Sequence, residues 1–135
     1  MLKTLIPIFL GGGLGSIARY LTGKGVDRLL SKFLPSRSPG PFEYTSVPLG
    51  TFLSNVMACL ILGLVVYMVA REQISGFWVP FFIVGFCGGY STFSTFSYET
   101  LGLMMSGRWP IAILNILVSV AVCIFILFVV AKQMK

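Results

Sequence analysis

The chain has 135 residues, of which 56% are apolar and only 10% are charged, and its mean hydropathy is +0.93. Soluble domains carry about one quarter charged residues, so this composition excludes a water-soluble enzyme and predicts one membrane domain over residues 1–135. The formal net charge is +6 and histidine is absent, which removes the commonest general base and metal ligand. The basic residues are scattered rather than clustered, so binding of nucleic acid is not expected either.

Four apolar segments follow one another along the chain. Each is long enough to cross a hydrocarbon core of about 30 Å as a helix. The sequence therefore predicts an all-α membrane protein with four transmembrane helices, over Thr4 to Thr22, Val47 to Ala70, Phe77 to Met105 and Trp109 to Ala131.

The first segment is rich in glycine. Gly13, Gly15 and Ala18 have the spacing of a dinucleotide-binding fingerprint, but that motif needs a preceding strand and a βαβ unit, which an apolar helix does not provide. Gly11 and Gly15 are four residues apart and predict a small-residue face for close helix packing in lipid.

The longest polar stretch, residues 23–46, separates the first two spans. Within it, Val26, Leu29, Leu30 and Phe33 would share one face of a helix. This pattern predicts a short interfacial helix over residues 26–33.

Polar side chains at depth in a membrane mark buried or water-lined faces. Thr51 and Asn55 share one face of the second segment, and Asn115, Ser119 and Cys123 form a stripe along the fourth. Such stripes serve either as hydrogen bonds between helices or as the lining of a path through the membrane.

The third segment contains the most informative sequence, GFCGGYSTFSTFSYE, over residues 85–99. Paired glycines followed by several hydroxyl residues disfavour a continuous helix, so we expect a break near Gly88 to Thr92. Unwound carbonyls suit a small hard cation, whereas a new helix N-terminus near Thr92 favours an anion.

Just after the expected break, Phe93 and Phe96 fall on one helical face beside Ser94 and Thr95. The edge of an aromatic ring is electropositive. Two ring edges next to hydroxyl donors would replace part of the water shell of a small anion, although paired phenylalanines also serve as plain packing.

The basic residues predict how the chain inserts. With four spans both termini lie on one side, and the positive-inside rule compares the two sides. The side of the termini has four basic residues, Lys3, Arg71, Lys132 and Lys135, and the other side has five, Lys24, Arg28, Lys32, Arg37 and Arg108. Because the two counts are nearly equal, we expect a chain that inserts in both orientations and pairs with an inverted copy of itself.

Three motifs resemble those of a known family, the Fluc (CrcB) fluoride channels: residues 11–20 (GGGLGSIARY), residues 48–55 (PLGTFLSN) and the GFCGGYSTFSTFSYE stretch. The resemblance implies an antiparallel, dual-topology homodimer in the plasma membrane (the inner membrane) of a prokaryote, with the third helix broken at its centre. It also implies passive export of fluoride from the cytoplasm, which protects the cell.

The resemblance further implies roles for individual residues. Phe93 and Phe96 would line the fluoride path and Asn55 would face it, while Gly88 and Ser91 would hold a structural sodium ion at the dimer centre through their backbone carbonyls. The other residues implied along the path are Ser94, Thr95, Thr51, Ser119 and Asn115, with Arg19 near its wide aqueous end. On the fourth span some relatives have a tyrosine and hydroxyls, where this chain has Asn115, Ser119 and Cys123.

Two other functions fit the size of the chain. One is a small dual-topology multidrug or cation exporter coupled to protons, which needs a carboxylate inside a span; Glu99 is the candidate. The other is an accessory membrane subunit without transport activity. Pairing with a paralogue instead of with itself also stays open.

Overall fold

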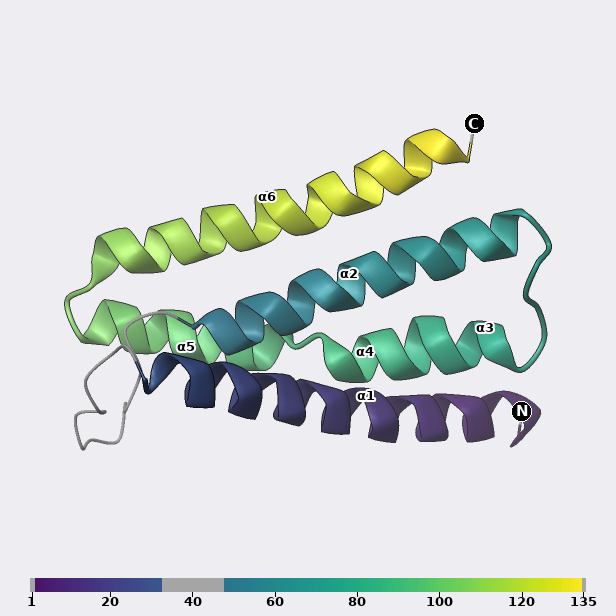
Figure 1. The fold of residues 1–135 in the computed structure, drawn as a ribbon, viewed down its shortest axis with the longest axis horizontal. Helices are drawn as coiled ribbons and strands as arrows, with labels where there is room; N and C mark the ends of the chain where they lie inside the picture. Colours follow the sequence, from purple (N-terminus) through teal and green to yellow (C-terminus); the bar gives the residue numbers. More distant parts are fainter. Residues whose placement is uncertain (1, 33–47, 135) are drawn as a thin grey trace.

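The computed structural model describes residues 2–32 and 48–134, and every regular element within them is helical. Helices α1 (Leu2–Leu30), α2 (Leu49–Ala70) and α6 (Trp109–Gln133) form the first, second and fourth spans, each as a single helix. The chain from Trp78 to Met105 forms the third span. All four are long and apolar enough to cross a membrane. The predicted all-α protein with four transmembrane helices is confirmed, and both ends of the chain lie at the same end of the bundle (Figure 1).

The third span is built from several pieces. It consists of α3 (Trp78–Pro80), the π-helical segment η1 (Phe81–Phe86), α4 (Cys87–Tyr90) and, after an interruption, α5 (Phe93–Met105). Helix α1 packs along η1 and α4, while α2 packs mainly on α6. In Figure 1, α2 runs between α6 and the pair formed by α1 and α4.

Helices α1 and η1–α4 are in backbone contact at the glycines of α1. A Cβ atom on Gly11 would overlap the carbonyl oxygen of Phe81, and one on Gly15 would overlap that of Phe86 and lie 2.9 Å from the amide nitrogen of Tyr90. Any larger residue would therefore force the helices apart. This confirms the expected small-residue face and holds the first half of the third span firmly against α1.

The short interfacial helix predicted over residues 26–33 is not a separate element. Helix α1 continues without interruption to Leu30, and the Ser31 amide still donates to the carbonyl oxygen of Asp27 at 2.9 Å. The prediction is wrong because residues 23–30 include no proline, so every amide can continue the helical ladder. Phe33 and residues 34–47 lie outside the described residues, as does the expected start of the second span at Val47.

The interruption of the third span is confirmed, but it is narrower than expected. Ser91 and Thr92 have extended backbone, with ψ of 155° and 112°. Gly88 stays inside α4, because a glycine does not by itself break a helix that packs against neighbouring helices. Two extended residues therefore separate α4 from α5.

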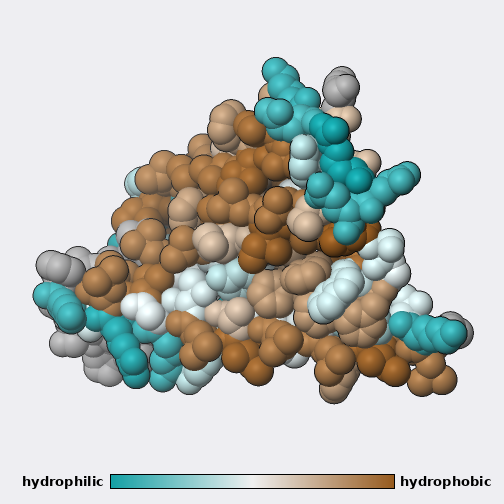
Figure 2. Space-filling view, turned by 45° about the vertical axis from the view of Figure 1, so that its right-hand side comes forward, coloured by the Kyte–Doolittle hydropathy of each residue, from teal (hydrophilic) through white to brown (hydrophobic). Residues whose placement is uncertain are grey.

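The surface of the chain matches a protein embedded in a bilayer. Figure 2 shows hydrophilic residues at the ends of the molecule and an apolar band between them. Only 6% of the apolar window in α6 is buried by the other described helices. The chain is thus a multi-pass membrane protein, and much of α6 faces lipid or another chain.

Candidate functional site: the break in the third span

The break is held open by a side chain of another helix. The amide N–H of Thr92 donates a hydrogen bond to the side-chain oxygen of Asn55 on α2, at 2.8 Å. Among the described residues, none accepts a hydrogen bond from the NH2 group of Asn55, which is half-buried. Asn55 therefore fixes the break with its oxygen and keeps two donor hydrogens for another partner.

Thr92 caps the second half of the span. Its hydroxyl oxygen accepts from the Thr95 amide at 3.3 Å, which is the usual role of a threonine before a helix. The same hydroxyl lies 3.0 Å from the Thr95 hydroxyl and 3.3 Å from the Ser94 hydroxyl. A cluster of three hydroxyls thus surrounds the first turn of α5, at the end where the helix dipole is positive.

The hydrogen bonds from the amides of Thr92 and Thr95 each take a donor away from a backbone carbonyl. In a continuous helix the Thr92 amide would bond to the Gly88 carbonyl, and the Thr95 amide to the Ser91 carbonyl. Here the first goes to Asn55 and the second to the Thr92 hydroxyl. The carbonyls of Gly88 and Ser91 have therefore lost their helical donors.

The two phenylalanines lie on the first turn of α5. Their ring centroids are 6.0 Å apart and the ring planes are inclined by 34°. The Phe93 side chain is 80% exposed, so most of its ring is left uncovered by this chain. The pair lies next to the hydroxyl cluster because Ser94 and Thr95 fall between the two positions.

The first half of the span is fixed just before the break. The hydroxyl oxygens of Tyr90 on α4 and Thr22 on α1 lie 2.9 Å apart and share a hydrogen bond, and Tyr90 is buried. Thr22 also donates its hydroxyl hydrogen to the carbonyl oxygen of Ala18 at 2.9 Å, so Tyr90 is the donor in the bond between the two hydroxyls. Helix α1 thus holds the residue before the break, and α2 holds Thr92 within it.

The polar stripe of α6 connects with α5. The Asn115 NH2 group donates to the Thr100 hydroxyl at 2.9 Å, and that hydroxyl donates to the carbonyl oxygen of Phe96 at 2.7 Å. The Ser119 hydroxyl lies 3.5 Å from the side-chain oxygen of Asn115. These contacts place the stripe alongside the phenylalanine pair. Cys123, further along, lies near Cys59 of α2 instead.

A carboxyl group lies one helical turn beyond the phenylalanines. The Thr51 hydroxyl hydrogen-bonds with Glu99, while the second carboxyl oxygen of Glu99 is buried without a partner among the described residues. Thr51 and Asn55 therefore both bind the third span from one face of α2, as their spacing indicated.

Most of the predicted site residues come together around the break. Asn55, Ser94 and Thr95 are joined directly through Thr92, whereas Arg19 makes no hydrogen bond or ion pair with any described residue. Arg19 is half-buried on α1, one turn after the Gly15 contact with α4.

Sequence reasoning missed Thr100 and Tyr90, and it gave Thr92 only as the start of the new helix. Thr100 lies just beyond the GFCGGYSTFSTFSYE stretch. Its role, like the bond from the Thr92 amide to Asn55, depends on which helix lies opposite. Tyr90 could have been suspected because it is a polar-tipped aromatic residue beside the expected break, where such groups need a partner.

The site offers mainly hydrogen-bond donors and ring edges. Within residues 2–32 and 48–134, no three His, Cys, Asp or Glu side chains gather as a metal cluster. Amide and hydroxyl donors, the ring edges and the N-terminus of α5 all favour an anion. The freed carbonyls beside them suit a cation with oxygen ligands.

Comparison with known proteins agrees with this geometry. Residues 6–131 match the profile of the family described as CrcB-like protein, Camphor Resistance (CrcB). A fluoride-specific ion channel FluC from Pyrococcus abyssi is 41% identical over 94% of this chain and 92% of its own length. Those from Flavobacterium psychrophilum and Coxiella burnetii are each 38% identical, over 88% and 89% of this chain and 86% and 88% of their own lengths. The chain therefore belongs to the CrcB family.

Proposed function

We propose that this chain forms a fluoride-selective channel that lets fluoride leave the cytoplasm passively. The observation that carries the proposal is the break in the third span, fixed by the Asn55–Thr92 hydrogen bond beside the Phe93–Phe96 pair. Relatives at 41% and 38% identity are named fluoride-specific ion channels. Neither the exporter nor the accessory subunit has comparable support.

The chemistry around the break suits a small anion. The Asn55 NH2 group and the Ser94 and Thr95 hydroxyls supply hydrogen-bond donors. The ring edges of Phe93 and Phe96 supply positive electrostatic potential without a formal charge. Fluoride is small and strongly hydrated, so a narrow route must replace several water contacts at once. Weak, successive contacts of this kind also let the ion leave again, which passive conduction requires.

The polar stripe of α6 would extend the route. Asn115 and Ser119 lie beyond Phe96 and are linked to it through Thr100. Thr51, which is buried on α2, would contribute a hydroxyl from the other side. Arg19 would attract anions toward the path from a half-buried position, through its field and not through a contact.

A second copy of the chain in inverted orientation would complete the path. Phe93 is 80% exposed and α6 is covered little by its own chain, so the route is open on one side. The near balance of basic residues between the two ends permits insertion in both orientations. We therefore propose an antiparallel homodimer, in which each chain lines a path with its partner.

A sodium ion would be held at the dimer centre by the carbonyls of Gly88 and Ser91 from each chain. These carbonyls fit the role because the amides that would bond to them in a helix donate to Asn55 and Thr92 instead. Such an ion supplies a fixed positive charge and a link between the two breaks.

The experiment is ion efflux from liposomes that contain the purified protein. Fluoride should leave in the absence of any proton gradient, and chloride should not. The variant Glu99→Gln separates the channel from the proton-coupled exporter. In an exporter Glu99 would be the carboxylate that carries the proton, so the variant should abolish transport. In a channel the variant should keep part of the fluoride flux. Fluoride movement that requires a proton gradient, or equal passage of chloride, would contradict the proposal.

The sodium site has its own test. Protein prepared and dialysed in choline or lithium buffer without sodium should conduct fluoride more slowly, and sodium should restore the rate. Unchanged flux in sodium-free buffer would count against the site and leave the channel proposal standing.

A further inference from the structure

We propose that the groove between the C-terminal halves of α2 and α6 binds an anionic phospholipid, with an acyl chain in the groove and the phosphate on Arg71. The site lies away from the break in the third span. It does not depend on the proposed transport function.

The groove exists because α2 and α6 approach closely at one point. A Cβ atom on Gly63 of α2 would lie 2.8 Å from a methyl carbon of Val130 on α6, so the helices touch there without filling the space beside the contact. The space measures about 280 Å³, roughly ten times what a single water needs. Its lining is largely apolar and consists of Leu60, Leu64, Tyr67, Val129, Val130 and Gln133.

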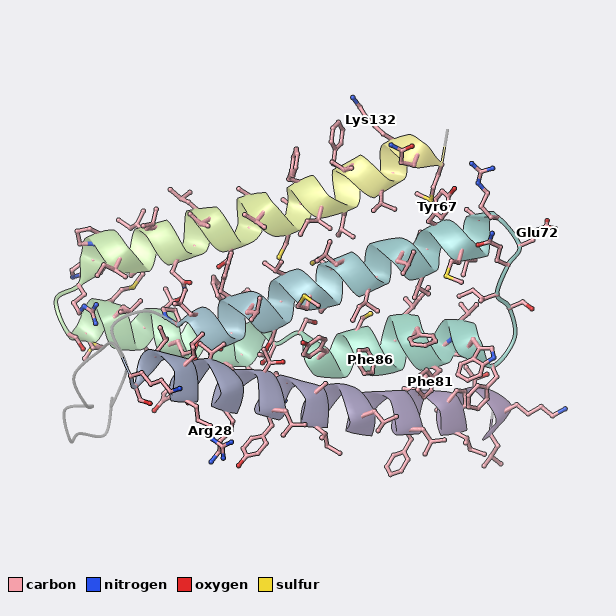
Figure 3. All side chains as sticks on the ribbon, in the orientation of Figure 1. Arg28, Tyr67, Glu72, Phe81, Phe86 and Lys132 are labelled. Atoms are coloured by element: carbon pink, nitrogen blue, oxygen red, sulfur yellow. The ribbon has the colours of Figure 1, made fainter. Side chains whose placement is uncertain are left out.

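The groove occupies the depth of one leaflet. Helix α2 has 22 residues, which at about 1.5 Å per residue span roughly the thickness of a hydrocarbon core. Its last turn is therefore at the level of the lipid headgroups. Tyr67 stands near that level between the ends of α2 and α6 (Figure 3), and Leu64 and Leu60 follow one and two turns deeper. A lipid tail can enter here from the bilayer.

The mouth of the groove carries positive charge. The guanidinium group of Arg71 lies over the ring of Tyr67, 5.3 Å from its centroid, and positions 60, 64, 67 and 71 share one face of α2. Lys132 on α6 is packed over Phe128 at 5.1 Å and points away from α2 (Figure 3). Glu72, next in sequence to Arg71, lines a different hollow with Thr4 and Val69.

Helix dipoles alone would explain a basic residue at each helix end. They do not explain why the Arg71 side chain lies above an apolar groove that opens at headgroup depth. A second copy of the chain is the other candidate occupant. It would have to bring carboxylates to this basic end, yet the chain has only four acidic residues against ten basic ones. A lipid phosphate is the better complement.

The test is retention of lipid by the full-length protein in native mass spectrometry, after exposure to a mixture of phosphatidylglycerol and phosphatidylcholine. The protein should retain phosphatidylglycerol in preference. Arg71→Gln should reduce that retention about fivefold, the factor expected for one basic residue at an anionic surface. Lys24→Gln is the matched control, since Lys24 lies over Tyr20 at 5.5 Å on another helix, and it should leave retention unchanged.

A second variant tests the groove without altering charge. Leu64→Trp should fill the space and reduce retention of phosphatidylglycerol while the oligomeric state in detergent is unchanged. Equal retention of the two lipids, or no effect of Arg71→Gln, would overturn the proposal. So would dissociation of the oligomer by Leu64→Trp, because that result would make the groove a contact between copies of the chain.

Discussion

The side-chain oxygen of Asn55 accepts the amide hydrogen of Thr92 at 2.8 Å, so α2 takes the place of the helical acceptor that Thr92 would otherwise use. A broken helix is tolerated in a membrane only when its freed backbone groups find partners. The side-chain oxygen of Asn55 satisfies one of these groups, the Thr92 amide, while its NH2 group keeps its two donor hydrogens. One residue therefore fixes the backbone, and in the proposed channel its NH2 group would also face the anion path.

Replacing Asn55 tests this double role. Asn55→Ala leaves the Thr92 amide without its acceptor, so we expect a loss of about 1–3 kcal/mol in the free energy of unfolding together with a slower fluoride flux. Ser54→Ala is the control, because the Ser54 hydroxyl donates within its own helix, to the Gly50 carbonyl. Thermal stability in detergent and efflux from liposomes measure the two effects. Equal behaviour of the two variants would mean that Asn55 has no special role.

The contact between α1 and the third span predicts a contrast between two glycines of one helix. Gly15→Ala would push a methyl group against the Phe86 carbonyl and the Tyr90 amide, whereas a Cβ atom on Gly13 has no neighbour within 4 Å. We expect Gly15→Ala to destabilise the fold by about 1–3 kcal/mol and Gly13→Ala to leave stability unchanged or slightly improved. Denaturation in mixed micelles would compare them. If both substitutions are harmless, the backbone contact is not as close as described.

The hydrogen bond between Tyr90 and Thr22 predicts an energetic coupling. Tyr90→Phe and Thr22→Val each remove one hydroxyl of the 2.9 Å pair, so the double variant should lose less stability than the sum of the single variants. The expected coupling is about 0.6 kcal/mol, typical of hydrogen bonds between membrane helices. Strict additivity in a double-mutant cycle would show that the two hydroxyls do not support each other.

The sequence made the spans and the break predictable because both depend on local composition. Twenty or so apolar residues form a membrane helix almost regardless of context, and the glycine and hydroxyl residues of positions 88–95 weaken one locally. A face for close helix packing at Gly11 and Gly15 also followed from a simple spacing rule. These features needed no knowledge of which helices are neighbours.

The partners across helices could not be predicted in the same way. Thr100 receives a hydrogen bond from Asn115, which is 15 residues away in the chain, and only the packing of α5 on α6 brings them together. The continuation of α1 to Leu30 was missed for a different reason: charged and apolar residues on a helix that leaves the membrane look the same as those of a separate interfacial helix.

The most direct test of the account concerns the two phenyl rings beside the break. The variant with Phe93→Ile and Phe96→Ile retains apolar side chains but removes both electropositive ring edges. Phe9→Ile is the control, since Phe9 is 79% exposed, much like Phe93 at 80%, but lies on α1. The account predicts that fluoride efflux from liposomes falls at least about tenfold in the double variant, while its oligomeric state and the flux of the control are unchanged. Fluoride efflux at the unaltered rate with both rings removed would contradict it.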